Sequence, residues 1–493
     1  MTVSSARAAA PPRSLGQAWI ALTGLSAVFL FEMLDNSILN VALPTIGREL
    51  SASTTSLQWI TGVYAVVFGG LMLAFGALAD RVGRRRIMLA GLIVLALASL
   101  ATAFVTTTGE LIAVRAAMGV AAAMTTPGSL ALAFRLFDDD LLRVRATTVI
   151  STVGLVGLAI GPTAGGFALA VVPWQALLLV NVPVAALAYL GIRRGIPADV
   201  PAELHRDPVD VAGALLGTAT IVLALVTPTL FVDLGTGSVW PWAGVAATLG
   251  AAVLFVVRER RARHPLLDLR LVARPLVSSG LAYKAASGLA TAGLGYLVTL
   301  QLQFGWGWTP AQAALGMLPQ VVVLIAGGAL IGPLVRRLGM GATAWISAVA
   351  TVCGLAVFTA LGPLGYGWVA LSLALVALGM RVVGVVAGTN VMRGLPENRT
   401  TIGAALVDTA SEVTTGLGIA LSGTVIAALF VGSIADPGWT AAQHAQFSVG
   451  VAWAGGSLTT LAALLVVFGM WRGRGAAPAA GDRGRGGGAQ GDG

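Results

Sequence analysis

Four acidic residues fall within long apolar runs, and their spacing could support proton chemistry. Glu32 and Asp35 are three residues apart, and Asp408 and Glu412 are four residues apart. On a helix, either spacing places both carboxyl groups on one face. Two neighbouring acids repel each other when both are ionised, and an apolar environment disfavours the charged form. One member of each pair can therefore hold a proton near neutral pH, and can exchange that proton for a cation.

Three basic residues, Arg115, Lys284 and Arg381, also fall within apolar runs, and Lys284 is the only lysine in the chain. A charged side chain at the centre of a bilayer costs about 2.5–3.5 kcal/mol on insertion scales, so each one needs a reason. One alternative is that the acids only neutralise these bases in fixed ion pairs. Four acids against three bases leave at least one acid unpaired, and this alternative is weakest for Asp35 and Glu412. We expect Asp35 and Arg115 to form a fixed or switching pair.

The elements that position these groups follow from composition. The 493-residue chain is 57% hydrophobic and 10% charged, with a mean hydropathy of +0.87, whereas a soluble domain carries about a quarter charged residues. Apolar runs of about 20 residues, the length of a membrane-spanning helix, recur along it. The sequence therefore predicts an all-α membrane protein. The fourteen predicted spans are 17–44, 56–79, 87–107, 111–134, 146–170, 174–192, 210–230, 241–257, 276–300, 311–332, 342–361, 366–390, 402–431 and 447–471.

The arginines alternate between the gaps that separate these spans. The gaps after even-numbered spans and both tails are rich in arginine, whereas the gaps after odd-numbered spans hold only Arg48. Because short cytoplasmic loops carry the Lys/Arg excess, we expect an even number of spans with both termini in the cytoplasm. The net charge of +9 is thus spread over loops and forms no single patch, which argues against nucleic acid as a partner.

One short loop recurs in the chain. Gly76–Gly83 and Gly332–Gly339 share the pattern Gly-x-Leu-x-x-Arg-x-Gly, and both lie between apolar runs. A loop repeated in two halves is typical of a transporter built by duplication. The predicted division is a disordered cytoplasmic N-terminus (1–16), a six-helix bundle (17–192), a linker with two extra transmembrane helices (193–275), a second six-helix bundle (276–471) and a disordered cytoplasmic tail (472–493).

Residues for other chemistry are sparse. The single cysteine, Cys353, allows no disulfide within the chain, and His205, His264 and His444 are scattered in polar connections. No nucleophile with a neighbouring base, metal cluster or phosphate loop is evident. We therefore expect no metal and no cofactor, and a membrane enzyme or receptor is the least favoured class.

Five stretches resemble the major facilitator superfamily and, within it, the fourteen-span drug/proton antiporters that export quaternary ammonium compounds and other cationic drugs. The resemblance runs from about residue 17 to 470. It is carried by the loop after the second span (Gly76, Asp80, Arg81, Gly83, Arg84), the first-span stretch Leu34 to Pro44, Arg115 with Gly119 in the fourth span, the fifth-span antiporter pattern (Gly154, Gly157, Gly161, Pro162, Gly165, Gly166), and Ala404 to Ala420 in the thirteenth span.

The resemblance implies a role for each stretch. Asp80 and the neighbouring arginines would latch helix ends on the cytoplasmic side. The fifth-span glycines would let another helix approach and slide, with Pro162 as a kink, although packing alone is an equal alternative. The chain also departs from the family, because the acid that quaternary ammonium exporters carry in the tenth span is absent and the polar residues there are Gln312 and Gln320.

The leading hypothesis is a proton-coupled antiporter that exports amphipathic, cationic compounds across a bacterial plasma membrane, driven by the proton gradient. Proton coupling and substrate binding are assigned to Asp35, Glu32, Asp408, Glu412 and Arg115, and Arg381 and Lys284 are possible charge partners that could also admit an anionic or zwitterionic ligand. The expected partners are the substrate, protons and the lipid bilayer, and the chain is expected to be a monomer. The alternative is a dedicated exporter of one endogenous compound, such as a self-made antibiotic or a lipid.

Overall fold

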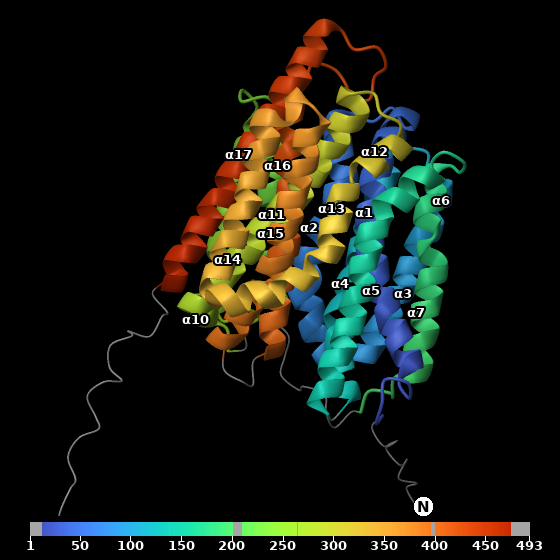
Figure 1. Ribbon diagram of the computed structural model, residues 1–493, viewed down its shortest axis with the longest axis vertical. Helices are drawn as coiled ribbons and strands as arrows, with labels where there is room; N and C mark the ends of the chain where they lie inside the picture. The colour runs from blue at the N-terminus through green and yellow to red at the C-terminus, as the bar shows by residue number, and fades with distance from the viewer. Residues whose placement is uncertain (1–11, 138, 201–209, 264, 396–399, 475–493) are drawn as a thin grey trace, which may run out of the picture.

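The structure is a computed structural model, and it describes residues 12–137, 139–200, 210–263, 265–395 and 400–474. Every regular element in these ranges is a helix (Figure 1). The parts of the predicted tails at 1–11 and 475–493 lie outside the described residues. The helices are α1 (Trp19–Glu49), α2 (Thr54–Val82), α3 (Arg84–Ala101), α4 (Thr108–Leu136), α5 (Asp140–Ala168), α6 (Trp174–Leu179), α7 (Asn181–Gly195), α8 (Val211–Leu234), α9 (Val239–Arg261), α10 (Leu269–Val272), α11 (Pro275–Leu300), α12 (Pro310–Gly316), α13 (Leu318–Ala326), α14 (Gly328–Leu361), α15 (Tyr366–Gly394), α16 (Thr400–Leu429) and α17 (Ala441–Arg474). A π-helical turn, η3 (Gln301–Gly305), follows α11, and 3-10 turns lie at η1 (Thr102–Phe104) and η4 (Gly362–Leu364).

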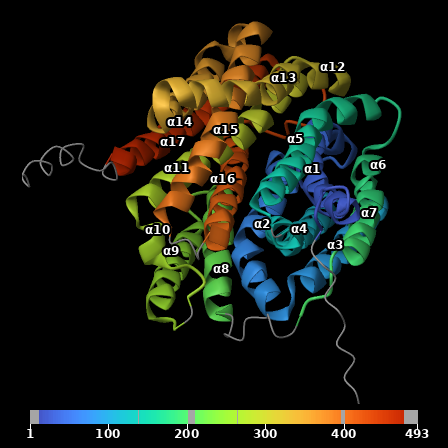
Figure 2. The same cartoon turned by 60° about the horizontal axis from the view of Figure 1, so that its bottom comes forward.

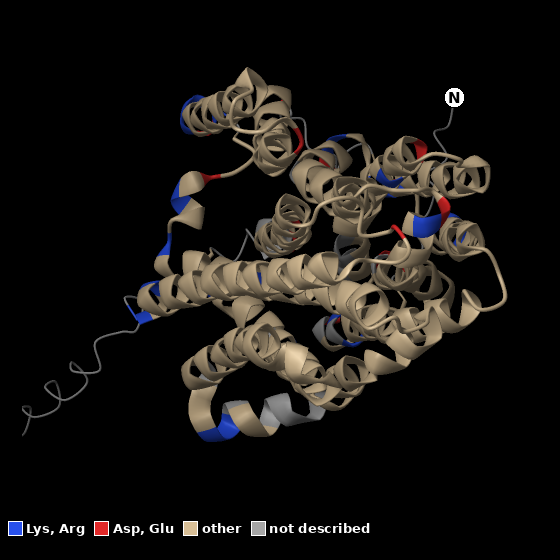
Figure 3. Cartoon of the chain, turned by 90° about the horizontal axis from the view of Figure 1, so that it is seen from above, with Lys and Arg blue, Asp and Glu red and all other residues tan. Residues whose placement is uncertain are grey.

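Thirteen of the described helical segments are long and apolar enough to cross a membrane. Polar side chains set several of their ends. Ser53 and Asp139 accept hydrogen bonds from backbone N–H groups in the first turns of α2 and α5, and Thr107 forms a capping box with Glu110 at the start of α4. Lys, Arg, Asp and Glu occupy few positions of the ribbon when the molecule is viewed from above, down its long axis (Figure 3).

The tenth predicted span, 311–332, is wrong as a single helix. The structure breaks this stretch into α12, α13 and the start of α14. Pro319 has no N–H group to continue the ladder, and the Gln320 amide donates to the Met317 carbonyl, three residues back. The carbonyl of Gly316 is thereby released and accepts a hydrogen bond of 3.1 Å from the Tyr366 hydroxyl. The predicted sixth span, 174–192, has a turn at Val180 between α6 and α7, and Trp174–Gly195 as a whole is long and apolar enough to cross a membrane.

The long helices pack into two groups. In the first group α1 packs on α5 and α7, α2 packs on α4, and α3 packs on α4 and α7. In the second group α11 packs on α15, α16 and α17, and α14 packs on α15 and α17. Figure 1 shows the first group in blue to green and the second in yellow to red. Buried apolar side chains of both groups, such as Leu25 and Leu289, belong to one hydrophobic cluster.

Helices α8 and α9 form a hairpin outside both groups (Figure 2). An ion pair of 3.0 Å between Asp210 Oδ1 and Arg258 Nη2 joins the start of α8 to the end of α9. Burial by itself would raise the pKa of Asp210, but hydrogen bonds from Arg258 and from the Gly213 amide lower this pKa below its usual value. The ion pair therefore stays charged and keeps the hairpin together.

At one end of the molecule, hydrogen bonds tie the two groups together. We call the end near the first and last described residues the terminal end and the opposite end, at α12, the far end (Figure 1). At the far end Ser433 Oγ donates to the Ala52 carbonyl at 2.6 Å, and the Ile434 amide donates to Thr54 Oγ1 at 3.3 Å. Gln303, in η3, donates to the Val41 carbonyl of α1 at 2.9 Å. The far end is therefore held closed by hydrogen bonds between the groups.

Candidate functional site

A cavity of about 290 Å³ lies between the two groups and is lined from both. Its charged residues are Glu32 from α1, Lys284 from α11, and Asp408 and Glu412 from α16. Most of its other walls are apolar or carry hydroxyl groups, including Phe29, Met33, Phe68, Thr126, Leu158, Pro162, Ser287, Thr291, Met317, Gln320, Val321, Leu324, Met380, Ser411, Thr415 and Ile419. Three carboxyl groups and one amine in a mostly apolar space can hold an amphipathic cation.

Glu32 is the acid that the first group contributes to this cavity. Its side chain is 4% exposed and accepts a hydrogen bond of 2.8 Å from Thr126 Oγ1 on α4. The same group contributes the apolar Phe29 and Met33, one turn or less away on α1. Thr126 was not singled out by the sequence, because a threonine within a helix gives no signal of a distant carboxylate partner.

Asp408 and Glu412 lie one turn apart on α16 and both line the cavity, as their spacing predicted. Lys284 faces the same space from α11. In the part of the chain that the structure describes, no ion pair joins Lys284 to any of the three cavity carboxylates. One carboxylate oxygen of Glu412 is buried and has no hydrogen-bond partner among the described residues. Within the described residues, no fixed ion pair therefore neutralises these acids.

Asp35 has different surroundings. It forms a fully buried ion pair with Arg115, which confirms the predicted pair, and it accepts a second hydrogen bond of 2.8 Å from Asn181 on α7. Arg115 also donates to the Ile60 carbonyl at 3.3 Å and lies 4.7 Å from the Tyr64 ring centroid. Asp35 and Arg115 do not line the central cavity. The expectation that fixed pairing would be weakest for Asp35 is wrong, because side chains from α4 and α7 both bind its carboxylate.

Asn181 and Tyr64 complete this buried network, and the sequence analysis missed Asn181. Asn181 is a lone amide in an apolar run, which is a usable signal, because an unpaired amide in a membrane is costly. Tyr64 belongs to α2. Its ring is fully buried beside Arg115, and its hydroxyl has no partner among the described residues.

Arg381 lies on α15, next to the cavity-lining Met380, but does not itself line the cavity. Its Nε is buried without a hydrogen-bond partner in the described ranges. Successive residues on a helix point about 100° apart, so the chain position of Arg381 could not decide which neighbour faces the space. Lys284 is thus the possible charge partner that the structure brings to the acids.

The loop after the second span is a tight junction of α2 and α3. Gly83 ends α2 and begins α3 with a φ of 118°, a conformation that favours glycine. Asp80 pairs with Arg84 at 2.6 Å, and Arg81 is exposed. The sequence analysis missed Asp199, whose carboxylate accepts the amides of Arg85 at 3.2 Å and of Arg86 at 3.1 Å, because its partners lie more than 100 residues away.

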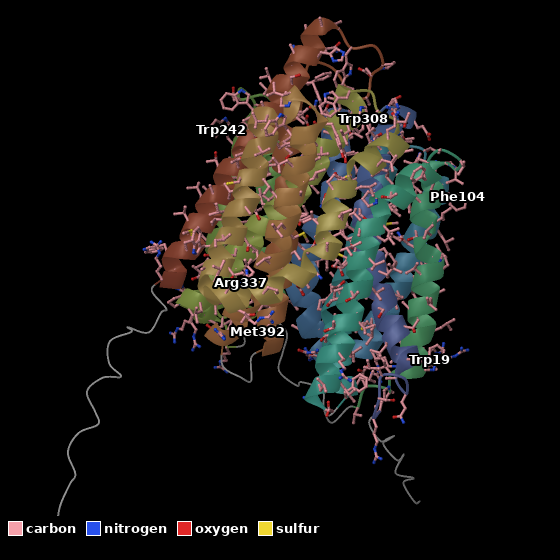
Figure 4. All side chains as sticks on the ribbon, viewed as in Figure 1. Trp19, Phe104, Trp242, Trp308, Arg337 and Met392 are labelled. Carbon is pink, nitrogen blue, oxygen red and sulfur yellow. The ribbon has the colours of Figure 1, made fainter. Side chains whose placement is uncertain are left out.

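The second copy of this loop keeps the same backbone feature. Gly339, which matches Gly83 in the repeated pattern, interrupts α14 with a φ of 76°. Arg336 and Arg337 precede it and are exposed, and Figure 4 shows Arg337 toward the terminal end, with Trp308 at the far end. The repeat is thus structural as well as sequential.

The fifth-span glycines bring α5 against two other helices. Gly154, Gly157, Gly161 and Gly165 face α1, at Phe29, Leu30, Ser37 and Ile38 respectively. Gly166 instead faces the Pro310 carbonyl and Ala314 of α12, in the second group. The predicted close approach is confirmed, whereas sliding at these contacts stays a prediction. Pro162 lines the cavity.

Two groups of membrane-spanning helices around a mostly apolar cavity with three acids and an amine are the architecture of a transporter rather than of an enzyme. The comparisons name its family: the model of the Major Facilitator Superfamily matches residues 25–419. The chain therefore belongs to that superfamily and is a multi-pass protein of the plasma membrane.

Curated relatives are similar over most of their length. The chain is 31% identical to the methyl viologen resistance protein SmvA of Salmonella typhimurium, over 86% of each chain. It is 31% identical to the cephamycin export protein CmcT of Amycolatopsis lactamdurans, over 85% of this chain and 86% of that one. It is 30% identical to the multidrug efflux pump LfrA of Mycolicibacterium smegmatis, over 86% of this chain and 84% of that one.

Solved structures show the same fold at lower sequence identity. A crystal structure of the peptide transporter POT matches with a TM-score of 0.65 and 14% identity, over 94% of this chain and 95% of that one. The human organic anion transporter MFSD10 matches with a TM-score of 0.61 and 16% identity, over 93% of this chain and all of that one. These matches bear on the fold alone.

Proposed function

We propose that the protein is a proton-coupled antiporter that exports amphipathic, cationic drugs or toxic compounds from the cytoplasm. The observation that carries this proposal is the group of three carboxylates, Glu32, Asp408 and Glu412, that line one central cavity from both helix groups. When all three are ionised they outweigh the single positive charge of Lys284, so the cavity attracts a cation. The names of SmvA and LfrA, which refer to methyl viologen resistance and multidrug efflux, agree with this substrate class.

The exchange occurs because protons and the substrate cation compete for the same carboxylates. A cation that enters from the cytoplasm is stabilised by the ionised acids in a low-dielectric cavity. When the groups tilt and the cavity faces outward, protons neutralise the acids and the cation loses its counter-charges. The buried pair of Asp35 and Arg115 lies beside this site, and we assign it the role of coupling α1 to α4 while Glu32 changes charge.

The topology proposed with this function has fourteen spans and both termini in the cytoplasm. The broken stretch Pro310–Ala326 adds a further span to the thirteen long apolar helices. The terminal end, which carries the arginine-rich loops, then faces the cytoplasm, and the closed far end faces outward. In this arrangement the bundles 17–192 and 276–471 rock about the cavity, as a monomer.

The test is pH-gradient-driven transport of a cationic dye in proteoliposomes. Glu32→Gln, Asp408→Asn and Glu412→Gln are compared with the parent and with Glu49→Gln, which removes an exposed acid outside the cavity. We expect at least one cavity variant to lose transport by about tenfold or more, equivalent to about 1.4 kcal/mol. The proposal is wrong if all three cavity variants transport like Glu49→Gln.

A second candidate is the dedicated export of one endogenous compound, anionic or zwitterionic. Lys284, the single amine among the cavity residues, is the observation that favours it, and CmcT is named for cephamycin export. The two candidate functions are distinguished by measuring transport of substrates of different charge by the parent and by Lys284→Gln. Lys284→Gln would weaken transport of an anion and strengthen binding of a cation.

A further inference from the structure

The central cavity has two side walls where the helix groups meet, and the structure builds them differently. We call the contact of α2 with α16 the covered seam and the contact of α5 with α12 and α13 the bare seam. Both sets of contacts join the first group to the second. Figure 2 shows α8 and α9 at the bottom of the view and α12 and α13 at the top, so the hairpin lies on the side of the covered seam.

Helix α8 forms a second layer over the covered seam. Leu225 of α8 is buried against Val66 of α2 and Ala420 of α16, and so bridges the two groups. Thr218 on α8 donates to the Gly70 carbonyl of α2 at 2.8 Å. Any path from lipid to the cavity on this side would have to pass α8 as well as the seam.

A single amide ties this layer together. Gln58 on α2 is 1% exposed, donates to Thr229 of α8 at 3.5 Å and accepts from Thr424 of α16 at 3.2 Å. The two hydrogen bonds connect the first group, the hairpin and the second group at one point. The covered seam is therefore closed by polar as well as apolar contacts.

The bare seam is one helix thick. On α13, Val321 lines the cavity while the next residue, Val322, is 60% exposed on the outer surface. On α5, Leu158 lines the cavity while Ile160 is 51% exposed. Each wall residue thus has an outward-facing neighbour, with no second layer of described helix between that neighbour and the surroundings.

The bare seam is also the weaker wall. Helix α13 has nine residues and lies between breaks at Met317 and Gly327, so its backbone is not held in one long ladder. The contact of Gly166 with α12 closes the seam near the far end. Farther from that end, Leu158 and Pro162 of α5 face the cavity together with Gln320, Val321 and Leu324 of α13.

We propose that amphipathic substrates enter the cavity laterally from the bilayer, through the bare seam between α5 and α13, and that the α8–α9 hairpin closes the covered seam against lipid. This inference rests on the proposed function, since it concerns the route of the same substrates. The chemical class it selects is a cation with enough apolar surface to partition into the membrane. A polar cation would reach the cavity only from water at the terminal end.

The test compares two cations in proteoliposomes of the full chain. Rhodamine 6G partitions strongly into lipid, and methyl viologen stays in water. Val321→Trp fills the bare seam. Ile419→Trp is the matched control, because it adds bulk to the same cavity from α16 at the covered seam. Val321→Ala widens the bare seam and is the test variant if Val321→Trp does not fold.

We expect Val321→Trp to lower the ratio of rhodamine to methyl viologen transport rates by about tenfold. We expect Ile419→Trp to lower both rates alike, and Val321→Ala to raise the ratio. The inference is overturned if the ratio is the same in all variants, if Ile419→Trp changes it as much as Val321→Trp, or if the parent transports methyl viologen but not rhodamine. In those cases the antiport proposal stands, whereas a parent that transports neither cation refutes both.

Discussion

At the scale of single residues, the acids of this protein fall into two kinds that their spacing could not separate. Asp35 is fully paired with Arg115 and hydrogen-bonded to Asn181, whereas Glu32, only three residues away, faces the cavity and bonds one threonine hydroxyl. Both side chains reach α4, so the prediction of a shared face was correct. What differs is the number of partners, because Asp35 is bound by a guanidinium and an amide, whereas Glu32 is bound by one hydroxyl group.

The buried pair gives a prediction about stability. Asp35→Asn leaves the guanidinium of Arg115 uncompensated in a buried site, which is strongly destabilising, by about 3–5 kcal/mol. Thermal unfolding in detergent measures the effect. The double variant Asp35→Asn/Arg115→Gln should recover part of the loss, because no charge is then left unpaired. An unchanged melting temperature for Asp35→Asn alone would contradict a structural role.

At the scale of elements, the repeated loop places a glycine with positive φ in two different packing environments. Gly83 and Gly339 both adopt positive φ at matching positions of the repeat. A side chain at Gly83 would collide with the Asp199 carboxylate, whereas a β-carbon at Gly339 would have no described neighbouring atom within 4 Å. Asp199 in turn holds the first amides of α3, where a negative charge is favoured.

This difference predicts unequal effects of the same substitution. Gly339→Ala should cost only the backbone strain of about 1–3 kcal/mol. Gly83→Ala should cost more, since it also displaces Asp199 from the amides of Arg85 and Arg86. Paired melting curves in detergent measure the two values, and Gly388→Ala, a helical site with open space around it, is the reference. Equal losses at Gly83 and Gly339 would show that the Asp199 contact is unimportant.

At the scale of the whole molecule, the two helix groups are joined at the far end and enclose a charged cavity. The joining contacts come from short connections, at Ala52 and Thr54 on one side and Ser433 and Ile434 on the other. Arg48, the single arginine expected on the outer side, lies 6.0 Å from the Phe304 ring centroid across the same junction. Opening the cavity at the far end requires all of these contacts to separate.

A cross-link across this junction should stop transport. A β-carbon at Gly47 would lie 3.4 Å from that of Ala435, close to the separation found in disulfides. In a Cys353→Ser background, Gly47→Cys/Ala435→Cys should lose pH-driven dye transport on oxidation and regain it on reduction, while each single-cysteine variant stays active. Full activity of the oxidised, cross-linked protein would show that the far end does not open.

Much of the fold could be predicted from the sequence, because a bilayer demands that each crossing satisfy its own backbone hydrogen bonds. Length, apolar runs and the repeated glycine loop were therefore enough for an all-helical transporter with an internal duplication. The break at Met317 was missed, because it depends on Pro319 together with the distant Tyr366 hydroxyl.

Sequence by itself also determined which residues were candidates, since a charge within an apolar run is costly wherever the run lies. Only the tertiary structure decided that Glu32, Asp408, Glu412 and Lys284 share one cavity, that Asp35 is held by Arg115 and Asn181, and that Arg381 lies outside the cavity lining. The physical reason is that pairing and exposure depend on helices far apart in the chain. The spacing of residues in the sequence determines which side chains share one face of a helix. It does not determine which other helix packs against that face.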